Sequence, residues 1–382
     1  MKYGGLVLAN LFRKKLRLML TIGSFAVALT LFGFLAVVKE AFSGGVEIAG
    51  ADRLVVINRV SIIQPLPLAY MDKMLRIPGV KSATHANWFG GVYQDEKNFF
   101  PQFAIDVDTW REMYPEFKLS DEQWNNFVKD RQGAIAGAAT AKRFGWKVGD
   151  RIPIKGTFLP GVWEFNLHGI YQGTRQADDE TQFWFQWKLF DEKIPQGNSY
   201  KGMVGWYTVK VENPDDSVRI AKAIDTDFAN SPYESRTETE KAFAQGWVKQ
   251  FGNIEFLILT IGAVVFFTLL LVTGNTMAIA VRERTGELAV LKAIGYSDAF
   301  VLVLVLMESL VIAGVGGGLG LLLAKGLTLF GDPTHGMLPV YYLPTRAMLV
   351  GVGAALLVGI ASGILPAVGA MRLRVVNALR RV

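Results

Sequence analysis

The residues that could carry chemistry are few, and their spacing fits no catalytic site. The three histidines stand at positions 85, 168 and 335 without a His-Glu-x-x-His pair, and the chain has no cysteine. A zinc hydrolase and thiol catalysis are therefore disfavoured. Neither Gly-x-Ser-x-Gly nor Gly-Lys-Ser/Thr occurs, so the sequence predicts no serine hydrolase and no ATP-binding loop. We predict no catalytic residue, no metal site and no cofactor in this chain, which is not an enzyme.

The most informative cluster of charged and apolar residues lies in segment 282–298. Leu288 and Leu291 fall on one side of a short amphipathic helix, whereas Glu283 and Glu287 are four residues apart. Like charges at that spacing cost a few tenths of a kcal/mol. Either a basic partner surface or Arg282, Arg284 and lipid headgroups neutralise them. The candidate residues of this segment are Arg282, Glu283, Arg284, Glu287, Leu288, Leu291, Lys292 and Gly295.

Four apolar stretches are long enough to position this segment in a membrane. They are residues 18–38, 256–281, 299–324 and 347–371, and together they contain a single charged residue, Glu308. A bilayer core of about 30 Å requires about 20 helical residues. A cleaved signal peptide is disfavoured for the first stretch because its apolar region is too long. The sequence predicts four transmembrane helices.

The basic residues predict the orientation of these helices. Residues 1–17, which we expect to form an interfacial helix, and the tail 372–382 carry Lys and Arg but no acid, and loop 282–298 is also flanked by basic residues. The loop at 325–346 has basic residues only at its edges. By the positive-inside rule, both termini and loop 282–298 are cytoplasmic, and segment 39–255 lies outside. The net charge of +6 is therefore a topology signal and not a nucleic-acid footprint.

Segment 39–255 is long enough to bury a core of its own. It holds 26 basic and 29 acidic residues, and all nine tryptophans. Its alternation predicts strands at 53–60, 80–89, 103–107, 151–155, 163–171 and 203–211, with helices at 65–76 and 215–229, a helix start at Ser120, and a strand followed by a helix at 134–144. We predict a mixed α+β extracytoplasmic domain between helices 1 and 2. A subdomain at about 115–203 is inserted into its frame, and a stalk follows at 238–255.

Two further groups of residues are candidates for contacts. Glu308, inside the third span, is expected to form a hydrogen-bonded contact between helices, and Gly314 and Gly318 to pack against span two or a second copy. Aromatic residues in the insert are candidates for an apolar substrate or partner, although core packing is the favoured interpretation for any single one. An aromatic on both faces of one strand suggested that one face is free. These residues are Phe99, Phe100, Phe103, Phe183, Trp184, Phe185 and Trp187.

The loop motif resembles a known family. Segment 275–298, followed by Glu308-Ser309 and the glycine run at 314–320, resembles the permease signature of the MacB/FtsX-like family of ABC transporters. Residues 359–380 resemble the last span and tail of that family, and residues 137–150 resemble part of its periplasmic core domain. The one-plus-three arrangement of spans around a large outside domain is also similar.

The resemblance implies a permease in the bacterial inner membrane, paired with a second copy or a paralogue. Two copies of a separate ABC ATPase would bind ATP and Mg, and segment 282–295 would be the coupling helix seated on that ATPase. Family members transmit ATP-driven closure to the outside domain. A lipid, lipoprotein, peptide or drug is the expected substrate, and a periplasmic adaptor or outer-membrane channel is a further expected partner.

Two other function classes compete with this interpretation. An FtsX-like regulatory module would use ATP to switch an outside partner such as a cell-wall hydrolase. The large ectodomain favours the transporter. A membrane-anchored extracellular enzyme is disfavoured by the missing catalytic residues and by three spans beyond the one anchor it needs.

Overall fold

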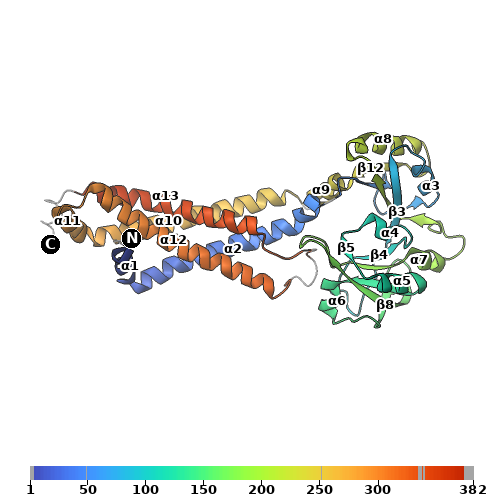
Figure 1. Ribbon diagram of the computed structural model, residues 1–382, viewed down its shortest axis with the longest axis horizontal. Helices are drawn as coiled ribbons and strands as arrows, with labels where there is room; N and C mark the ends of the chain where they lie inside the picture. Colours follow the sequence, from blue (N-terminus) through green and yellow to red (C-terminus); the bar gives the residue numbers. More distant parts are fainter. Residues whose placement is uncertain (1–3, 49, 251, 334–337, 339, 374–382) are drawn as a thin grey trace. The chain divides into compact units, whose positions relative to one another are not determined.

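A computed structural model describes residues 4–48, 50–250, 252–333, 338 and 340–373, and the chain divides into two compact units. The helical bundle comprises Met1–Glu40, Asn253–Gly331 and Tyr341–Val382, and the sheet domain comprises Ala41–Gly252 and Asp332–Val340 (Figure 1). His335, Lys2 and the tail residues 374–382 of the predicted topology lie outside the described residues.

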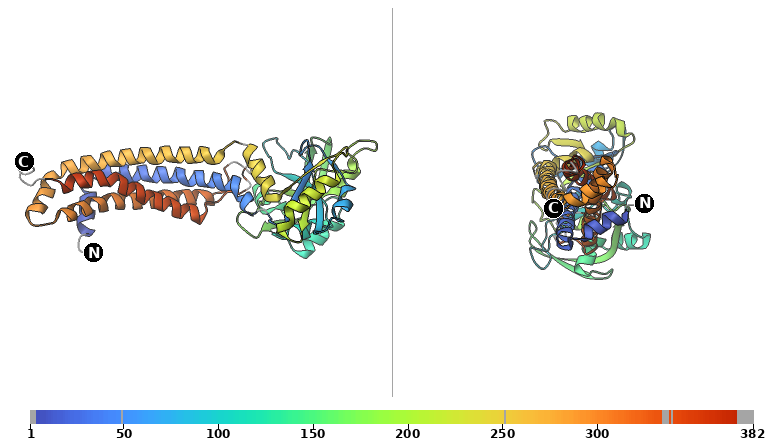
Figure 2. Two further views of the ribbon diagram at one scale, coloured as in Figure 1. Left: turned by 90° about the horizontal axis from the view of Figure 1, so that it is seen from above. Right: turned by 90° about the vertical axis from the view of Figure 1, so that its left-hand side faces the viewer.

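Within the described residues, four helices are long and apolar enough to cross a membrane, and the sheet domain is inserted between the first two. This confirms the predicted fold class. Figures 1 and 2 show α2, α10, α12 and α13 running alongside one another. The helices of this part of the chain are α1 (Gly4–Phe12), α2 (Lys15–Ile48), α10 (Ile254–Glu283), α11 (Thr285–Ala293), α12 (Asp298–Leu329) and α13 (Thr345–Met371).

Glycines bring α2 and α12 into close contact. A Cβ atom on Gly316 would lie 2.8 Å from the carbonyl oxygen of Ile22. One turn later, Gly320 packs on Ala26, and the hydroxyl of Thr30 donates a hydrogen bond of 3.0 Å to the Gly320 carbonyl oxygen. Small residues at a spacing of four allow this approach in membrane helices.

The predicted packing of Gly314 and Gly318 against span two is wrong. Nothing in the described part of the chain lies within 4 Å of a Cβ placed on either residue. Residues two apart on a helix point about 200° from each other, so these glycines face away from the seam that Gly316 and Gly320 form with α2. Contact with a second copy stays a prediction for Gly314 and Gly318.

The sheet domain is built on one continuous sheet, in the order β12-β1-β11-β3-β4-β9-β6-β8-β5 with β7 paired to β8. Segment 115–203 therefore extends the sheet of its frame. Most pairs are antiparallel, but β4 runs parallel to β9, and β6 parallel to β8. The strands are β1 (Arg53–Asn58), β2 (Leu66–Pro67), β3 (Val80–Trp88), β4 (Gln102–Ile105), β5 (Phe117–Lys118), β6 (Gly133–Gly137), β7 (Arg151–Gly156), β8 (Gly161–Gly173), β9 (Phe183–Gln186), β10 (Met203–Val204), β11 (Trp206–Val211) and β12 (Ser235–Thr239).

Helices cover both faces of this sheet. The hydroxyl of Ser120 accepts a hydrogen bond from the backbone N–H of Gln123, which confirms the predicted helix start. The helix predicted at 65–76 is shorter than expected, and edge strand β12 was missed. The helices are α3 (Tyr70–Met74), α4 (Trp110–Met113), α5 (Asp121–Lys129), α6 (Ala138–Phe144), α7 (Trp187–Lys193), η1 (Pro214–Asp216), α8 (Ser217–Asp227) and α9 (Glu240–Gln250).

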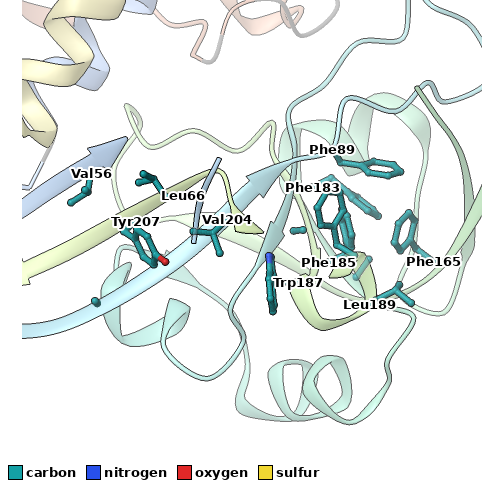
Figure 3. Close-up of a cluster of buried hydrophobic side chains, with 14 of the residues drawn as sticks. Val56, Leu66, Phe89, Phe165, Phe183, Phe185, Trp187, Leu189, Val204 and Tyr207 are labelled. Atoms are coloured by element: carbon teal, nitrogen blue, oxygen red, sulfur yellow. The ribbon is translucent and has the colours of Figure 1, made fainter. Parts of the chain in front are cut away.

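Because both faces are covered, alternate residues of the central strands enter two different cores. Phe183 and Phe185 of β9 lie in the larger core with Phe89 and Phe165 (Figure 3), whereas Trp184 lies in the smaller core on the opposite face. A strand buried on both faces has no solvent side, so alternation along it carries no information about exposure.

His85 on β3 is buried beside the larger core, with its ring 4.8 Å from that of Trp187. Burial lowers the pKa of His85 to about 4, although the Asp106 carboxylate 3.8 Å away opposes the change. The unfolded chain therefore binds the proton more readily than the folded one. As the pH falls from about 6.5 to about 4, this residue is expected to reduce the free energy of unfolding by up to about 3 kcal/mol.

The check is urea unfolding of the full chain at several pH values, followed by tryptophan fluorescence. The variant His85→Gln should lose this part of the pH dependence. The matched variant His168→Gln alters a histidine whose side chain is 28% exposed and lies 2.8 Å from Asp130. This variant should keep the pH dependence of the free energy of unfolding that is due to His85. The prediction would be contradicted if the free energy of unfolding changed equally with pH in the parent chain and in His85→Gln.

Candidate functional site

The turn between α10 and α12 is short and built from defined caps. Arg284 ends α10 and begins α11. Gly295 follows α11 with a φ of +106°, a conformation that side chains disfavour. The hydroxyl of Ser297 then accepts the N–H of Phe300 to start α12. The predicted amphipathic element is therefore the helix α11, held between two long helices.

A buried ion pair fixes the beginning of α11. The Arg284 guanidinium donates hydrogen bonds of 3.0 and 2.5 Å to the two carboxylate oxygens of Glu308. The side-chain amide of Asn10 on α1 donates a third, of 2.9 Å. Glu308 thus forms the expected hydrogen-bonded contact between helices. Arg284 is buried and points inward, so its side chain contributes no surface to a docking partner.

The two stacked glutamates are neutralised by the same chain. Glu283 pairs with Lys14 at 2.9 Å and with Arg17 at 2.7 Å, and Glu287 pairs with Arg13. The junction of α1 and α2 therefore supplies basic side chains that offset this repulsion, a source that the sequence analysis did not name. Sequence reasoning missed this because some 270 residues separate the partners.

Some of the remaining predicted residues of this segment pack against the bundle, and others are exposed. Leu288 is buried and Leu291 packs against the bundle core. The Lys292 ammonium donates to the carbonyl oxygens of Met371 and Leu373, at 2.7 and 2.8 Å, and pairs with Asp298. Lys292 therefore ties α11 to the end of α13. Arg282 and Gly295 are exposed.

An apolar face of α11 that the sequence analysis did not select points outward. Val290 is 45% exposed and Ile294 is 72% exposed, one turn further on, with the half-exposed Tyr296 after them. The sequence does indicate this face, since residues four apart lie on the same side of a helix. The sequence analysis selected Leu288 and Leu291, which lie on the opposite side. We define Val290, Ile294 and Tyr296 as the α11 face.

Most of the aromatic candidates in the sheet domain are core residues. Phe100, Phe183, Trp184, Phe185 and Trp187 are all buried. The inference that one face of this strand is free was wrong, because β9 lies between β4 and β6 in a sheet with a core on each face. These five residues stabilise the domain and present no surface to a substrate.

Phe99 is exposed, Phe103 is partly buried against the smaller core, and the fold adds two exposed aromatic residues that were not predicted, Trp88 and Phe158. Phe99 stacks on Trp88 with 6.1 Å between ring centroids, and Phe103 meets the edge of Trp88 at 5.5 Å. Phe158, in the turn between β7 and β8, is exposed near them. Their clustering depends on loop contacts between β3 and the β7–β8 hairpin, which no local pattern encodes.

A second buried charge cluster connects the start of α9 to strand β1. The Arg53 guanidinium contacts Glu240, the first residue of α9, at 2.6 Å and Glu116 at 2.7 Å. The same Glu240 oxygen accepts the backbone N–H of Gly50, just beyond α2. Burial opposes the charge on Arg53, but the hydrogen bonds and charges of the two glutamates raise its pKa above the ordinary value. We call Arg53, Glu116 and Glu240 the root cluster.

No group of three or more His, Asp or Glu side chains in the described ranges is placed to hold a metal ion. The features with a functional geometry are the α11 face, the root cluster, and the residues Trp88, Phe99 and Phe158, which we call the exposed aromatic group.

Comparisons with known proteins support the resemblance. Residues 259–375 match the family model of the FtsX-like permease C-terminal domain. An uncharacterized ABC transporter permease of Methanocaldococcus jannaschii is 24% identical over 65% of this chain and 61% of its own length. The lipoprotein-releasing system transmembrane protein LolE of Haemophilus influenzae is 24% identical over 56% of this chain and 52% of its own length. The chain thus matches less than two thirds of either relative.

A solved structure is also similar. The periplasmic region of MacB from Actinobacillus actinomycetemcomitans aligns with 54% of this chain and 95% of that region, at 13% identity and a TM-score of 0.38.

The segment that matches the family model, residues 259–375, contains most of α10 and all of α11, α12 and α13. The resemblance predicted from the loop is confirmed over residues 259–375, which match the model of the FtsX-like permease C-terminal domain.

Proposed function

We propose that this chain is the permease subunit of an ABC transporter in a bacterial inner membrane, where it works as a pair with a second copy or a paralogue. ATP and Mg would be bound by two copies of a separate cytoplasmic ATPase. The chain's own task is mechanical: it receives the movement of the ATPase at α11 and passes it to the sheet domain outside. The observation that carries this proposal is the α11 face, within a segment that matches the family model.

The α11 face has the properties of a docking helix. Val290 lies on α11 and Ile294 caps its end, and the position of this short helix is fixed from within by Arg284, Glu308 and Lys292. A rigid helix with an exposed apolar face suits insertion into a groove on another protein. The charged side chains of α11, Glu287 and Lys292, form ion pairs with other residues of this chain. Affinity for the ATPase would therefore come from Val290 and Ile294.

The root cluster supports transmission at the other end. Glu240, at the start of α9, contacts both Gly50 and Arg53, and Arg53 also forms an ion pair with Glu116. A buried, fully bonded ion cluster resists separation because either partner left alone would be an unpaired buried charge. A displacement of α9 or of the end of α2 would therefore move the strand β1 and segment 113–116 with it.

The substrate would be lipophilic, and the work would be its export or its extraction from the outer leaflet. The described spans contain one charge inside the membrane, Glu308, and it is bonded to Arg284 and Asn10. Such spans offer no polar path for a hydrophilic solute.

The variant Ile294→Asp tests the docking role. A carboxylate in an apolar groove loses its hydration without a partner, so we expect ATPase binding to weaken at least about 30-fold, the effect of a strong interface residue. The measurement is recovery of the ATPase, and of its ATP hydrolysis, with tagged chain in mild detergent. Val218→Asp, at a 79% exposed position in the sheet domain, is the matched control.

Undiminished ATPase recovery with Ile294→Asp would contradict the docking role. The same preparation from the parent chain separates the two functions still open. Co-purified lipid or lipoprotein supports export, and a cell-wall hydrolase in their place supports the regulatory alternative.

A further inference from the structure

The exposed aromatic group lines a cavity whose walls are held in place by backbone contacts. Loop 89–101 between β3 and β4 forms one wall. The side-chain amide nitrogen of the buried Gln102 donates to the carbonyl oxygen of Gly91 at 2.9 Å. The backbone N–H of Gly91 donates in turn to the amide oxygen of Gln102 at 2.8 Å. Val92 pairs with Lys155 of β7 through two backbone hydrogen bonds, and the Thr157 hydroxyl donates to the carbonyl of Gly90. These hydrogen bonds connect loop 89–101 to β4, to β7 and to the turn after β7.

Three large aromatic rings at this cavity are open to solvent. Trp88 is 41% exposed, Phe99 is 47% exposed and Phe158 is 72% exposed. Gly90 lets two of them meet across the loop: a Cβ there would lie 2.8 Å from the Trp88 ring nitrogen and 3.0 Å from the Phe158 ring. Single exposed apolar residues are ordinary on a protein surface, whereas rings gathered into one patch are typical of a binding surface.

The charged groups that line the cavity are both acidic. Asp95 and Glu96 line it together with the aromatic rings. One oxygen of Asp95 accepts the backbone N–H of Lys97, while the Glu96 side chain is exposed and makes no ion pair within the described residues. The neighbouring Arg143 is not one of the lining residues, and it donates a hydrogen bond of 2.8 Å to the carbonyl oxygen of Phe99.

We propose that this cavity binds small organic cations that carry an apolar group. The face of a tryptophan attracts an ammonium group, and aromatic cages recognise quaternary ammonium in this way. The carboxylates add charge complementarity, and Phe99 and Phe158 cover the apolar part. A volume of about 280 Å³, just below the usual range for ligand sites, suits one ring with its ammonium group. The site belongs to the sheet domain and does not depend on ATPase docking.

The test is isothermal titration of the full chain, in a neutral detergent, with benzyltrimethylammonium. Saturable binding is expected, with at least about tenfold weaker binding of the neutral benzyl alcohol and of the variant Trp88→Ala. Phe158→Ala removes a ring at a loop tip and should weaken binding without affecting folding. The double variant Asp95→Asn with Glu96→Gln should weaken binding severalfold at low salt.

Matched controls are Tyr200→Ala, an exposed aromatic elsewhere in the sheet domain, and Glu122→Gln, an exposed carboxylate on α5. Both should bind like the parent chain. The proposal is overturned if benzyltrimethylammonium shows no saturable binding, if benzyl alcohol binds equally well, or if folded Trp88→Ala and Phe158→Ala bind as the parent does. Capture of a protein by this surface without any binding of the cation would also overturn it.

Discussion

Replacing Trp184 with alanine is expected to lower the free energy of unfolding of the sheet domain by about 3–5 kcal/mol. Trp184 is 2% exposed and stacks on Tyr171 with 4.1 Å between ring centroids. Its indole N–H donates to the side chain of Gln182 at 2.9 Å. Truncation would leave a large cavity between the sheet and the elements that cover the smaller core, and this cavity cannot close without moving β5 and β8.

Urea unfolding of the full chain measures this effect, with near-ultraviolet circular dichroism as the readout. All nine tryptophans lie in the sequence of the sheet domain, so the signal reports on that unit. Trp184→Phe should retain part of the stability. Tyr200→Ala, at an exposed position, should change it by less than about 0.5 kcal/mol. If Trp184→Ala unfolded like the parent chain, the assignment of β9 to a doubly covered sheet would be wrong.

Replacing Arg284 with methionine is expected to destabilise the helical bundle by about 3–5 kcal/mol. The change removes two hydrogen bonds to Glu308 and leaves its carboxylate buried with Asn10 as its remaining described partner. The double variant Arg284→Met with Glu308→Leu removes the unpaired charge and should recover much of the loss, because an apolar pair can replace a buried ion pair.

The bundle lacks tryptophan, so its unfolding in detergent is followed by far-ultraviolet circular dichroism of helix content. Arg282→Met changes an exposed arginine two residues away and should stay within about 0.5 kcal/mol of the parent chain. A single Arg284→Met variant as stable as the double variant would show that Glu308 is not held by this pair.

The sequence was sufficient to predict the architecture because its signals are local. Uncharged stretches of about 20 residues identify spans on length alone, and the alternation in β8 and the hydroxyl of Ser120 identify a strand and a helix start. The strand and helix of segment 134–144 were also predicted, and they appear as β6 and α6. These features depend on neighbours within a few residues.

The site was predicted in position but not in detail, because its contacts are long-range. Glu283 and Glu287 were seen as a repulsive pair, yet the arginines and lysine that neutralise them come from the first 17 residues. Gly314 and Gly316 are equivalent in sequence, and only the position of α2 distinguishes them. Likewise, β9 is aromatic on both faces, and burial on both sides depends on its placement between β4 and β6.

The most direct test of the central claim uses the absence of cysteine from the chain. Ile294→Cys introduces a single thiol on the α11 face, and Val60→Cys introduces one at an exposed position in the sheet domain. Each variant is labelled with a thiol-reactive photo-crosslinker in native membranes and irradiated. We predict that the label at Ile294→Cys joins the chain to an ATPase with a Gly-Lys-Ser/Thr loop, whereas the label at Val60→Cys does not. Crosslinking of the ATPase from Val60→Cys, or none from Ile294→Cys when the ATPase is present, would contradict the account.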